Sequence, residues 1–94
     1  MKTIYTAMNE PRKDGAGDVY EENPTFDKSE ALRHAVYAWN HLTSREQQQR
    51  RVYVAVYAVD VPEDDPRPAA QIYQEMMLDD TWPHDWDVIN LPAE

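Results

Sequence analysis

The chain has 94 residues, which is enough for one domain and leaves no room for a second. It is 41% hydrophobic, has a formal net charge of -9 and contains no cysteine, so disulfides and thiolate metal sites are excluded and a reducing compartment is favoured. The opening residues match neither a signal peptide nor a membrane span. We therefore expect one domain over residues 1–94, in the cytoplasm and without a membrane contact.

The acidic residues are unevenly distributed. From Asp60 to Asp87 there are nine acidic residues and one fixed cation, Arg67, whereas residues 28–51 have a weakly basic balance. The large negative charge disfavours binding to nucleic acid or to an anionic membrane through general electrostatics. The asymmetry is a cue for a protein partner.

Residues 2–8 alternate loosely between apolar and polar side chains, which predicts a first strand. Residues 9–17 hold both glycines and a proline, which predicts a turn or loop. Residues 18–26 are compatible with a second strand that pairs back as a hairpin, although Asn23 and Pro24 interrupt it. If this strand forms, it lies at an edge of the sheet.

The clearest start of a helix is at Asp27. Its side chain can cap the helix, Glu30 completes a capping box, and Phe26 and Ala31 are spaced for a hydrophobic staple. Apolar residues then recur at helical spacing: Ala31, Leu32, Ala35, Val36, Ala38, Trp39 and Leu42. The pattern predicts an amphipathic helix over residues 28–42.

The middle of the chain predicts a short helix followed by a central strand. Thr43 and Glu46 repeat the capping pattern, which predicts a polar turn or helix over residues 44–50. Residues 51–61 are apolar on both faces and favour a strand inside the sheet. The proline-rich residues 62–68 predict a loop.

The remaining segment offers two interpretations. Apolar residues at steps of three and four favour a second helix over residues 69–77, and the alternative is a strand over residues 70–73. Residues 79–85 predict a loop, and residues 86–91 alternate as a final strand. The fold class is α+β, with a small antiparallel or mixed sheet of three to four strands and one or two helices packed on one face.

One segment resembles a pattern found in small proteins without an assigned activity that are carried on mobile elements of gut bacteria. The residues that carry the resemblance are Ser29, Glu30, Ala31, Ala35, Trp39, Asn40, His41, Leu42, Thr43 and Glu46. The resemblance implies an accessory or host-interaction role, and it implies no site residue.

The sequence gives little support to an enzymatic function. His34 and His41 are seven residues apart, whereas helical metal ligands are usually three or four apart. The loop around His84 is rich in carboxylates, so a small metal- or ligand-dependent enzyme or sensor is the alternative hypothesis. Ser29 and Ser44 stand at helix starts, where capping explains them. We predict no catalytic residue, no cofactor and no bound metal.

Surface recognition is the leading hypothesis. If the helices cover one face of the sheet, Tyr53, Tyr57 and Tyr5 line the other, and tyrosine is favoured at interfaces. The alternative is that these tyrosines cover an edge of a small core. Trp82 and Trp86 flank a proline among acidic residues, and core packing is the stronger expectation for Trp86. The predicted interaction residues are Tyr5, Tyr53, Tyr57, Asp60, Glu63, Asp64, Asp65, Asp79, Asp80, Trp82, Asp85 and Asp87.

The sequence therefore predicts a non-enzymatic interaction protein, an accessory or inhibitory factor of unknown target. One hypothesis is that its acidic surface mimics the phosphates of nucleic acid, and the alternative is that this surface only keeps the protein in solution. A homodimer through a strand edge or the tyrosine face is a further hypothesis. A regulator that binds nucleic acid through Arg45, Arg50 and Arg51 is disfavoured by the net charge.

Overall fold

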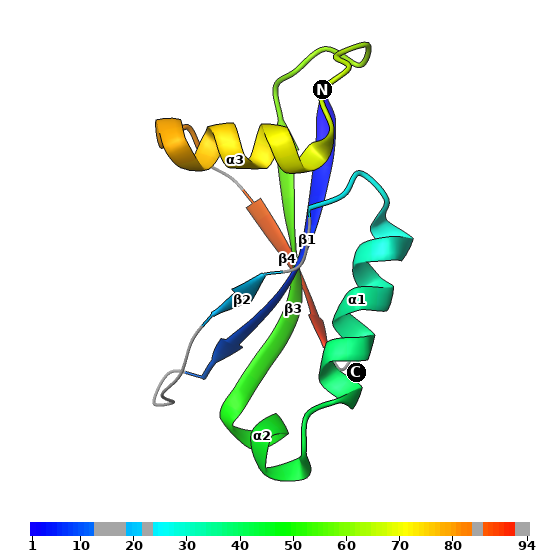
Figure 1. Ribbon diagram of the computed structural model, residues 1–94, viewed down its shortest axis with the longest axis vertical. Helices are drawn as coiled ribbons and strands as arrows, with labels where there is room; N and C mark the ends of the chain where they lie inside the picture. The colour runs from blue at the N-terminus through cyan, green and yellow to red at the C-terminus, as the bar shows by residue number, and fades with distance from the viewer. Residues whose placement is uncertain (13–18, 22–23, 84–85, 92–94) are drawn as a thin grey trace.

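The computed structural model describes residues 1–12, 19–21, 24–83 and 86–91. In these residues the chain forms a four-stranded antiparallel sheet with the strand order β2-β1-β3-β4 (Figure 1). Three helices accompany the sheet in the same described ranges, so the predicted α+β class and small antiparallel sheet are confirmed.

The two longest strands form the centre of the sheet. β1 (Lys2–Pro11) pairs along its whole length with β3 (Arg50–Val59). Both strands were predicted from alternation, and each is displaced or extended by a few residues from its predicted range. β3 is flanked by β1 and β4, which confirms it as a central strand.

The edge strands are short. β2 (Tyr20–Glu21) pairs with β1 as the predicted hairpin edge, but in two residues only. Thr25 adds an isolated bridge to Tyr5 after that strand. β4 (Trp86–Leu91) forms the opposite edge and confirms the predicted final strand.

α1 (Lys28–Asn40) begins where the capping signal predicts. The Asp27 side chain accepts hydrogen bonds from the backbone N–H groups of Ser29 and Glu30. The second half of the predicted capping box is absent between these described residues, because the Asp27 N–H donates to Thr25 Oγ1 and Glu30 accepts from the same hydroxyl. Thr25 thus takes the place that Glu30 was expected to fill.

The other two helices also settle sequence-based expectations. α2 (Ser44–Gln49) has the complete Thr43–Glu46 capping box and buries none of its residues. α3 (Ala69–Asp79) is the second predicted helix, so the alternative strand over residues 70–73 is wrong. Its buried residues recur at helical steps: Ala69, Ile72, Tyr73 and Met76.

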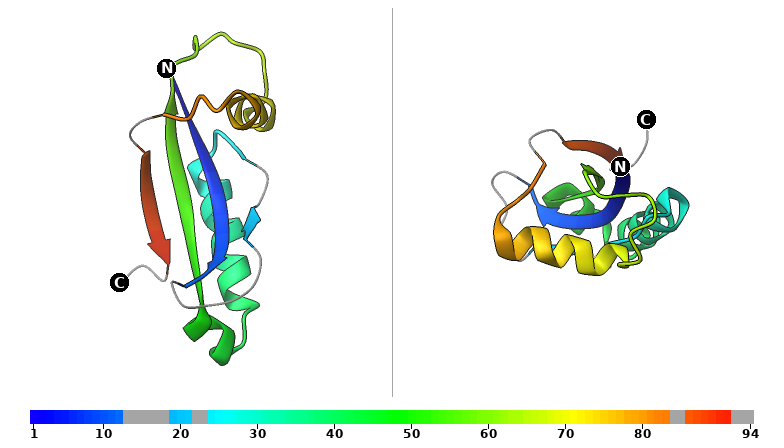
Figure 2. Two further views of the ribbon diagram at one scale, coloured as in Figure 1. Left: turned by 90° about the vertical axis from the view of Figure 1, so that its left-hand side faces the viewer. Right: turned by 90° about the horizontal axis from the view of Figure 1, so that it is seen from above.

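The helices divide between the two faces of the sheet, where the sequence predicted that they share one. Ala31 and Ala35 of α1 pack with Val52 and Val54 of β3 on one face. On the opposite face α3 packs at one end of a buried cluster that contains the alternate β3 residues Tyr53, Ala55, Tyr57 and Val59. α1 runs alongside the strands, whereas α3 crosses them near the start of β1 (Figures 1 and 2). Because β3 is apolar on both faces, each face needs its own cover.

No helix in the described part of the chain is long and apolar enough to cross a membrane.

The cap of α1 gives a stability prediction. Asp27→Ala removes the acceptor for two N–H groups of the first turn, so we expect the free energy of unfolding to fall by about 1 kcal/mol. Urea unfolding measures the change. Ser29→Ala, at an exposed position in the same turn, is the control. An equal loss in both variants would contradict the capping role of Asp27.

Candidate functional site

The predicted acidic surface is divided between several places. Glu63 and Asp64 are exposed in the connection between β3 and α3. Asp80 is the C-cap of α3 and has a left-handed backbone with φ of 54°, a conformation that aspartate tolerates better than most residues. Asp60 and Asp79 both line an open cleft of about 490 Å³ between the end of β3 and α3. The cleft is therefore the place where two of the predicted acidic residues meet.

Arg67 offsets part of the negative charge at this cleft. Its guanidinium forms ion pairs with Asp65, at 2.8 Å, and with Glu75. The backbone N–H of Arg67 also donates to Asp65 Oδ1 at 3.0 Å, and the Lys2 ammonium donates to the Asp65 carbonyl oxygen at 2.6 Å. The hydrogen bonds from Arg67 lower the pKa of Asp65 to about 2. Asp65 is thus engaged in fixing its own loop.

Four aromatic rings gather where β3, α3 and β4 meet. The Tyr57 ring lies at the centre, with its centroid 6.0 Å from Tyr73, 5.4 Å from Trp82 and 5.8 Å from Trp86. Tyr73 and Trp82 also meet edge to face at 5.2 Å. The rings surround a hollow of about 300 Å³, here called the aromatic pocket, which is lined by Met8, Glu21, Tyr57, Tyr73, Trp82, Pro83 and Trp86.

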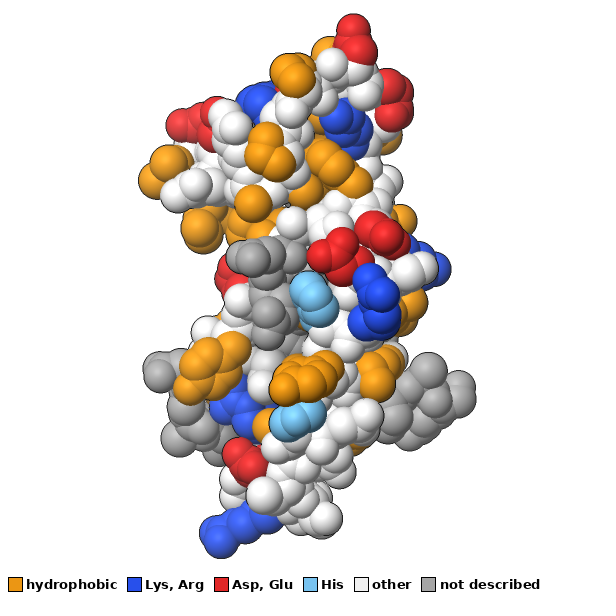
Figure 3. All heavy atoms as spheres, turned by 45° about the vertical axis from the view of Figure 1, so that its right-hand side comes forward, with side chains coloured by type: hydrophobic (Ala, Val, Ile, Leu, Met, Phe, Trp, Pro, Cys, Tyr) orange, Lys and Arg blue, Asp and Glu red, His pale blue; other side chains and the backbone are white. Residues whose placement is uncertain are grey.

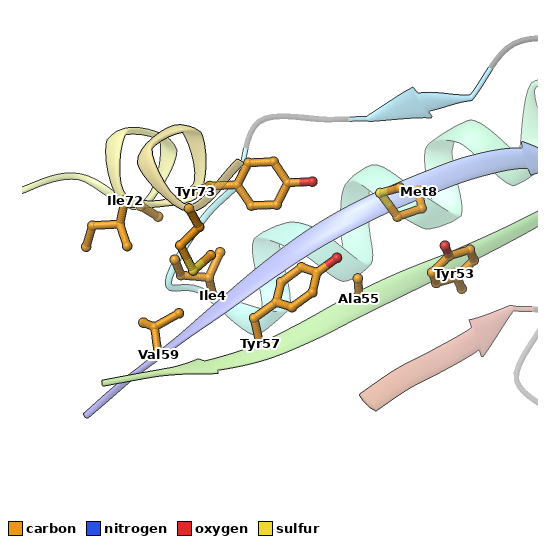
Figure 4. Close-up of a cluster of buried hydrophobic side chains, with 10 residues drawn as sticks. Ile4, Met8, Tyr53, Ala55, Tyr57, Val59, Ile72 and Tyr73 are labelled. Carbon is orange, nitrogen blue, oxygen red and sulfur yellow. The ribbon is translucent and has the colours of Figure 1, made fainter. Parts of the chain in front are cut away.

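A carboxylate from the far edge of the sheet completes this pocket. The Tyr73 hydroxyl donates to Glu21 Oε2 at 3.0 Å, which joins α3 to β2. Burial, reinforced by this hydrogen bond and by the charge of Glu21, raises the pKa of Tyr73 above its ordinary value of 10. Burial likewise raises the pKa of Tyr57. Figure 4 shows both hydroxyl groups directed toward the side on which Met8 lies. The pocket therefore combines aromatic rings with one carboxylate group.

The predicted tyrosine face does not form as a single surface. Tyr53 and Tyr57 are buried beneath the α3 side of the sheet, where they belong to the core. Tyr5 lies on the opposite face and packs against the α1 core. The Tyr53 hydroxyl donates to Glu10 at 3.3 Å, and the Arg51 guanidinium lies 4.3 Å from its ring centroid. Of the three tyrosines, Tyr57 is the one that lines the aromatic pocket.

The two tryptophans have the reverse of their expected roles. Trp82 is half-buried and packs against the α3 core, whereas the Trp86 side chain is 51% exposed on β4. The expectation that Trp86 is the core residue is therefore wrong. Trp86 is exposed because it lies on β4, the edge strand. It pairs with Tyr57 of β3 on one side, and no further strand among the described residues flanks it on the other.

Sequence reasoning missed Glu21, Tyr73 and Trp86 as members of a common site. The spacing of Tyr73 predicts a place in a helix and no pocket, and Glu21 lies in a segment whose pattern does not decide between strand and loop. The aromatic content of residues 73–86 was the available signal. The pairing of Met8 with Glu21, which places the carboxylate, is a long-range register that periodicity does not encode.

Metal ligation finds no support in the described residues, because no group of three or more His, Cys, Asp and Glu side chains there is arranged to hold an ion. Figure 3 shows two histidine side chains separated by hydrophobic ones on the α1 side of the molecule. His84 and Asp85 lie outside the described residues, so the metal hypothesis for their loop stays a prediction.

Of the three basic residues considered for nucleic-acid binding, Arg50 and Arg51 have partners within the fold. Arg50 donates to the Asn9 side chain at 2.6 Å, and its guanidinium lies 5.3 Å from the Tyr20 ring centroid. Arg51 forms an ion pair with Glu10 at 3.0 Å. Arg45 is exposed on α2. Two of these three arginines are thus engaged within the fold.

Comparison with known proteins finds no matching family model, no matching curated protein and no matching solved structure. The resemblance to proteins of mobile elements stays a prediction.

The low pKa of Asp65 predicts an acid-dependent loss of stability. The carboxylate stabilises the fold fully above its ordinary pKa of 3.8, and this contribution is lost as the pH falls toward about 2. Asp65→Asn should therefore weaken the decline of the unfolding free energy over this range. Urea unfolding at a series of pH values tests the expectation, with the exposed Asp64→Asn as control. Parallel curves for Asp65→Asn and the wild type would contradict it.

The raised pKa of Tyr73 predicts a loss of stability as the pH rises, whereas Asp65 predicts a loss as the pH falls. The folded state holds the phenolic proton more tightly than the unfolded chain, so the contribution is complete below pH 10 and is lost as the pH rises further. We expect Tyr73→Phe to flatten the alkaline decline of the unfolding free energy. Tyr37→Phe removes a hydroxyl from a residue that is 65% exposed and serves as the control. A decline as steep in Tyr73→Phe as in the wild type would refute the assignment.

Proposed function

We propose that the protein is a non-enzymatic interaction protein that binds a positively charged partner through the aromatic pocket. The observation that carries this proposal is the convergence of four aromatic rings on a hollow that also contains the Glu21 carboxylate. The rings come from β3, α3, β4 and the connection before β4, so the pocket depends on the assembled fold.

The chemistry of the pocket suits a cation better than an anion or a neutral apolar group. The face of an aromatic ring carries negative electrostatic potential and attracts an ammonium or guanidinium group. Glu21 adds a formal negative charge beside the rings and can accept hydrogen bonds from such a group. The Tyr73 hydroxyl fixes one oxygen of this carboxylate, which reduces the ordering needed on binding.

An arginine side chain fits this arrangement especially well. Its guanidinium is planar, stacks on aromatic faces and presents several N–H donors in a fixed geometry. The exposed Trp86 ring offers a face for stacking, and Glu21 offers an acceptor in the same hollow. A partner that presents an arginine can satisfy both groups at once.

The charge of the whole molecule supports the same class of partner. The net charge of -9 attracts a basic protein over long range. Asp60 and Asp79 line the neighbouring cleft, and Pro83 lines both hollows. Through this attraction the protein acts as an accessory or inhibitory factor, occupying a basic surface of its partner without chemistry.

The test compares two blocked single-residue probes, arginine amide and citrulline amide, which have nearly the same shape and differ in charge. We expect calorimetric titration to show the arginine probe binding about tenfold more tightly, as one cation–π contact and one charged hydrogen bond would give. Trp86→Ala and Glu21→Gln should each remove most of that preference. Raising the salt concentration should weaken the arginine probe selectively.

Tyr37→Ala is the control, because this exposed aromatic residue lies on α1 and outside the aromatic pocket. It should bind the arginine probe as the wild type does. Equal affinity for the arginine and citrulline probes, or loss of binding in Tyr37→Ala alone, would refute the proposed function.

A further inference from the structure

Among the described residues, β4 has no neighbour on one side of the sheet, beside the aromatic pocket. It is the last strand in the order β2-β1-β3-β4, and its only strand neighbour among the described residues is β3. The left view of Figure 2 shows β4 as the outer strand. A strand in this position presents unpaired backbone N–H and C=O groups, which are a template for another extended chain.

A side-chain contact shows which amides face outward. The backbone N–H of Val88 donates to Asp87 Oδ1 at 2.8 Å, in place of a sheet partner. Successive residues of a strand direct these groups to alternate sides. Trp86, Val88 and Asn90 therefore present their N–H and C=O groups to the open side. Asp87 holds one of these amides in the free protein, and an incoming carbonyl oxygen can replace it.

Trp86 joins this edge to the aromatic pocket. Its Cα partner on β3 is Tyr57, and their ring centroids are 5.8 Å apart, so both side chains lie on the α3 face of the sheet. Residues that are directly opposite in a sheet have Cβ atoms roughly 5 Å apart on the same face. A residue that pairs with Trp86 from the open side would consequently place its side chain next to that ring.

The charge of the molecule selects among the possible occupants of this edge. A second copy of the chain would add its own net charge of -9 and bring Asp87 into the shared interface. Like charges opposite each other in a sheet are destabilising. A segment with basic residues would instead be attracted to this edge, since Asp87 is exposed on β4 and Glu21 lies in the pocket.

We propose that a basic, extended peptide segment of the partner pairs with β4 as a fifth strand and places an arginine opposite Trp86, against the exposed ring at the rim of the aromatic pocket. This inference rests on the proposed function and specifies the form of the partner. It also implies a second basic residue next to the arginine, opposite Asp87 on the α1 face. Main-chain hydrogen bonds supply affinity in this mode, and alternate side chains supply specificity.

The experiment uses a capped peptide of about seven residues, in which adjacent arginine and lysine residues are flanked by alternating valine and threonine. We expect it to bind about tenfold more tightly than blocked arginine amide, which can use only the pocket. Amide hydrogen exchange, followed by NMR, should slow at Val88 and Asn90 when the peptide is present. The arginine amide should leave exchange at these residues unchanged.

Asn90→Pro separates the edge from the pocket. It removes an outward N–H at an exposed residue, and proline is tolerated on edge strands. We expect the variant to lose the extra affinity for the peptide while it retains its affinity for arginine amide, which also shows that it is folded. Asn90→Ala keeps the N–H and separates the loss of the amide from the loss of the side chain.

The outcomes distinguish the two proposals. If the peptide and arginine amide bind equally and exchange on β4 is unchanged, strand addition is wrong and the pocket proposal stands. If neither cationic probe binds in preference to its neutral counterpart, both proposals fail. If a neutral peptide of the same pattern protects β4 as strongly as the basic one, the edge is open to any strand and the claimed basic specificity is overturned.

Discussion

The burial of β3 on both faces is the constraint on which the rest of the structure depends. Val52 and Val54 point to one side, and Tyr53, Ala55, Tyr57 and Val59 point to the other. Neither set can remain in water without a large loss of hydrophobic stabilisation. A single helical layer would cover one set alone, so the chain places α1 on the first face and α3 on the second. β1 and β4 then complete the backbone hydrogen bonding on either side of β3.

The candidate site is a product of that arrangement. α3 crosses the strands near one end, so it covers Tyr57 only in part and leaves room for the rings of Trp82 and Trp86. The short β2 brings Glu21 to the same corner, where the Tyr73 hydroxyl holds it. Tyr57 and Tyr73 thus belong to the buried core and also line the aromatic pocket. This is why stability and recognition are expected to share Tyr57 and Tyr73.

Much of the local structure was predictable, because it depends on neighbours in the chain. Asp27 caps α1 through the N–H groups two and three residues ahead, and Thr43 and Glu46 cap each other across the same span. The site was less predictable, since it depends on contacts between distant segments. The pairing of Met8 with Glu21 places the carboxylate, and the position of β4 at the edge exposes Trp86. A hydrophobic pattern identifies a buried face, but it does not say which helix will cover it.

The pairing of β1 with β3 also has a consequence for how the protein is made. Lys2 lies opposite Val59 and Pro11 opposite Arg50, so every pair in this ladder joins residues far apart in the sequence. Non-local pairing carries a loop-closure cost and slows folding. On the ribosome, this ladder cannot form before β3 has emerged. Until then the apolar side chains of β1, such as Ile4 and Ala7, lack the strand against which they are buried in the folded protein.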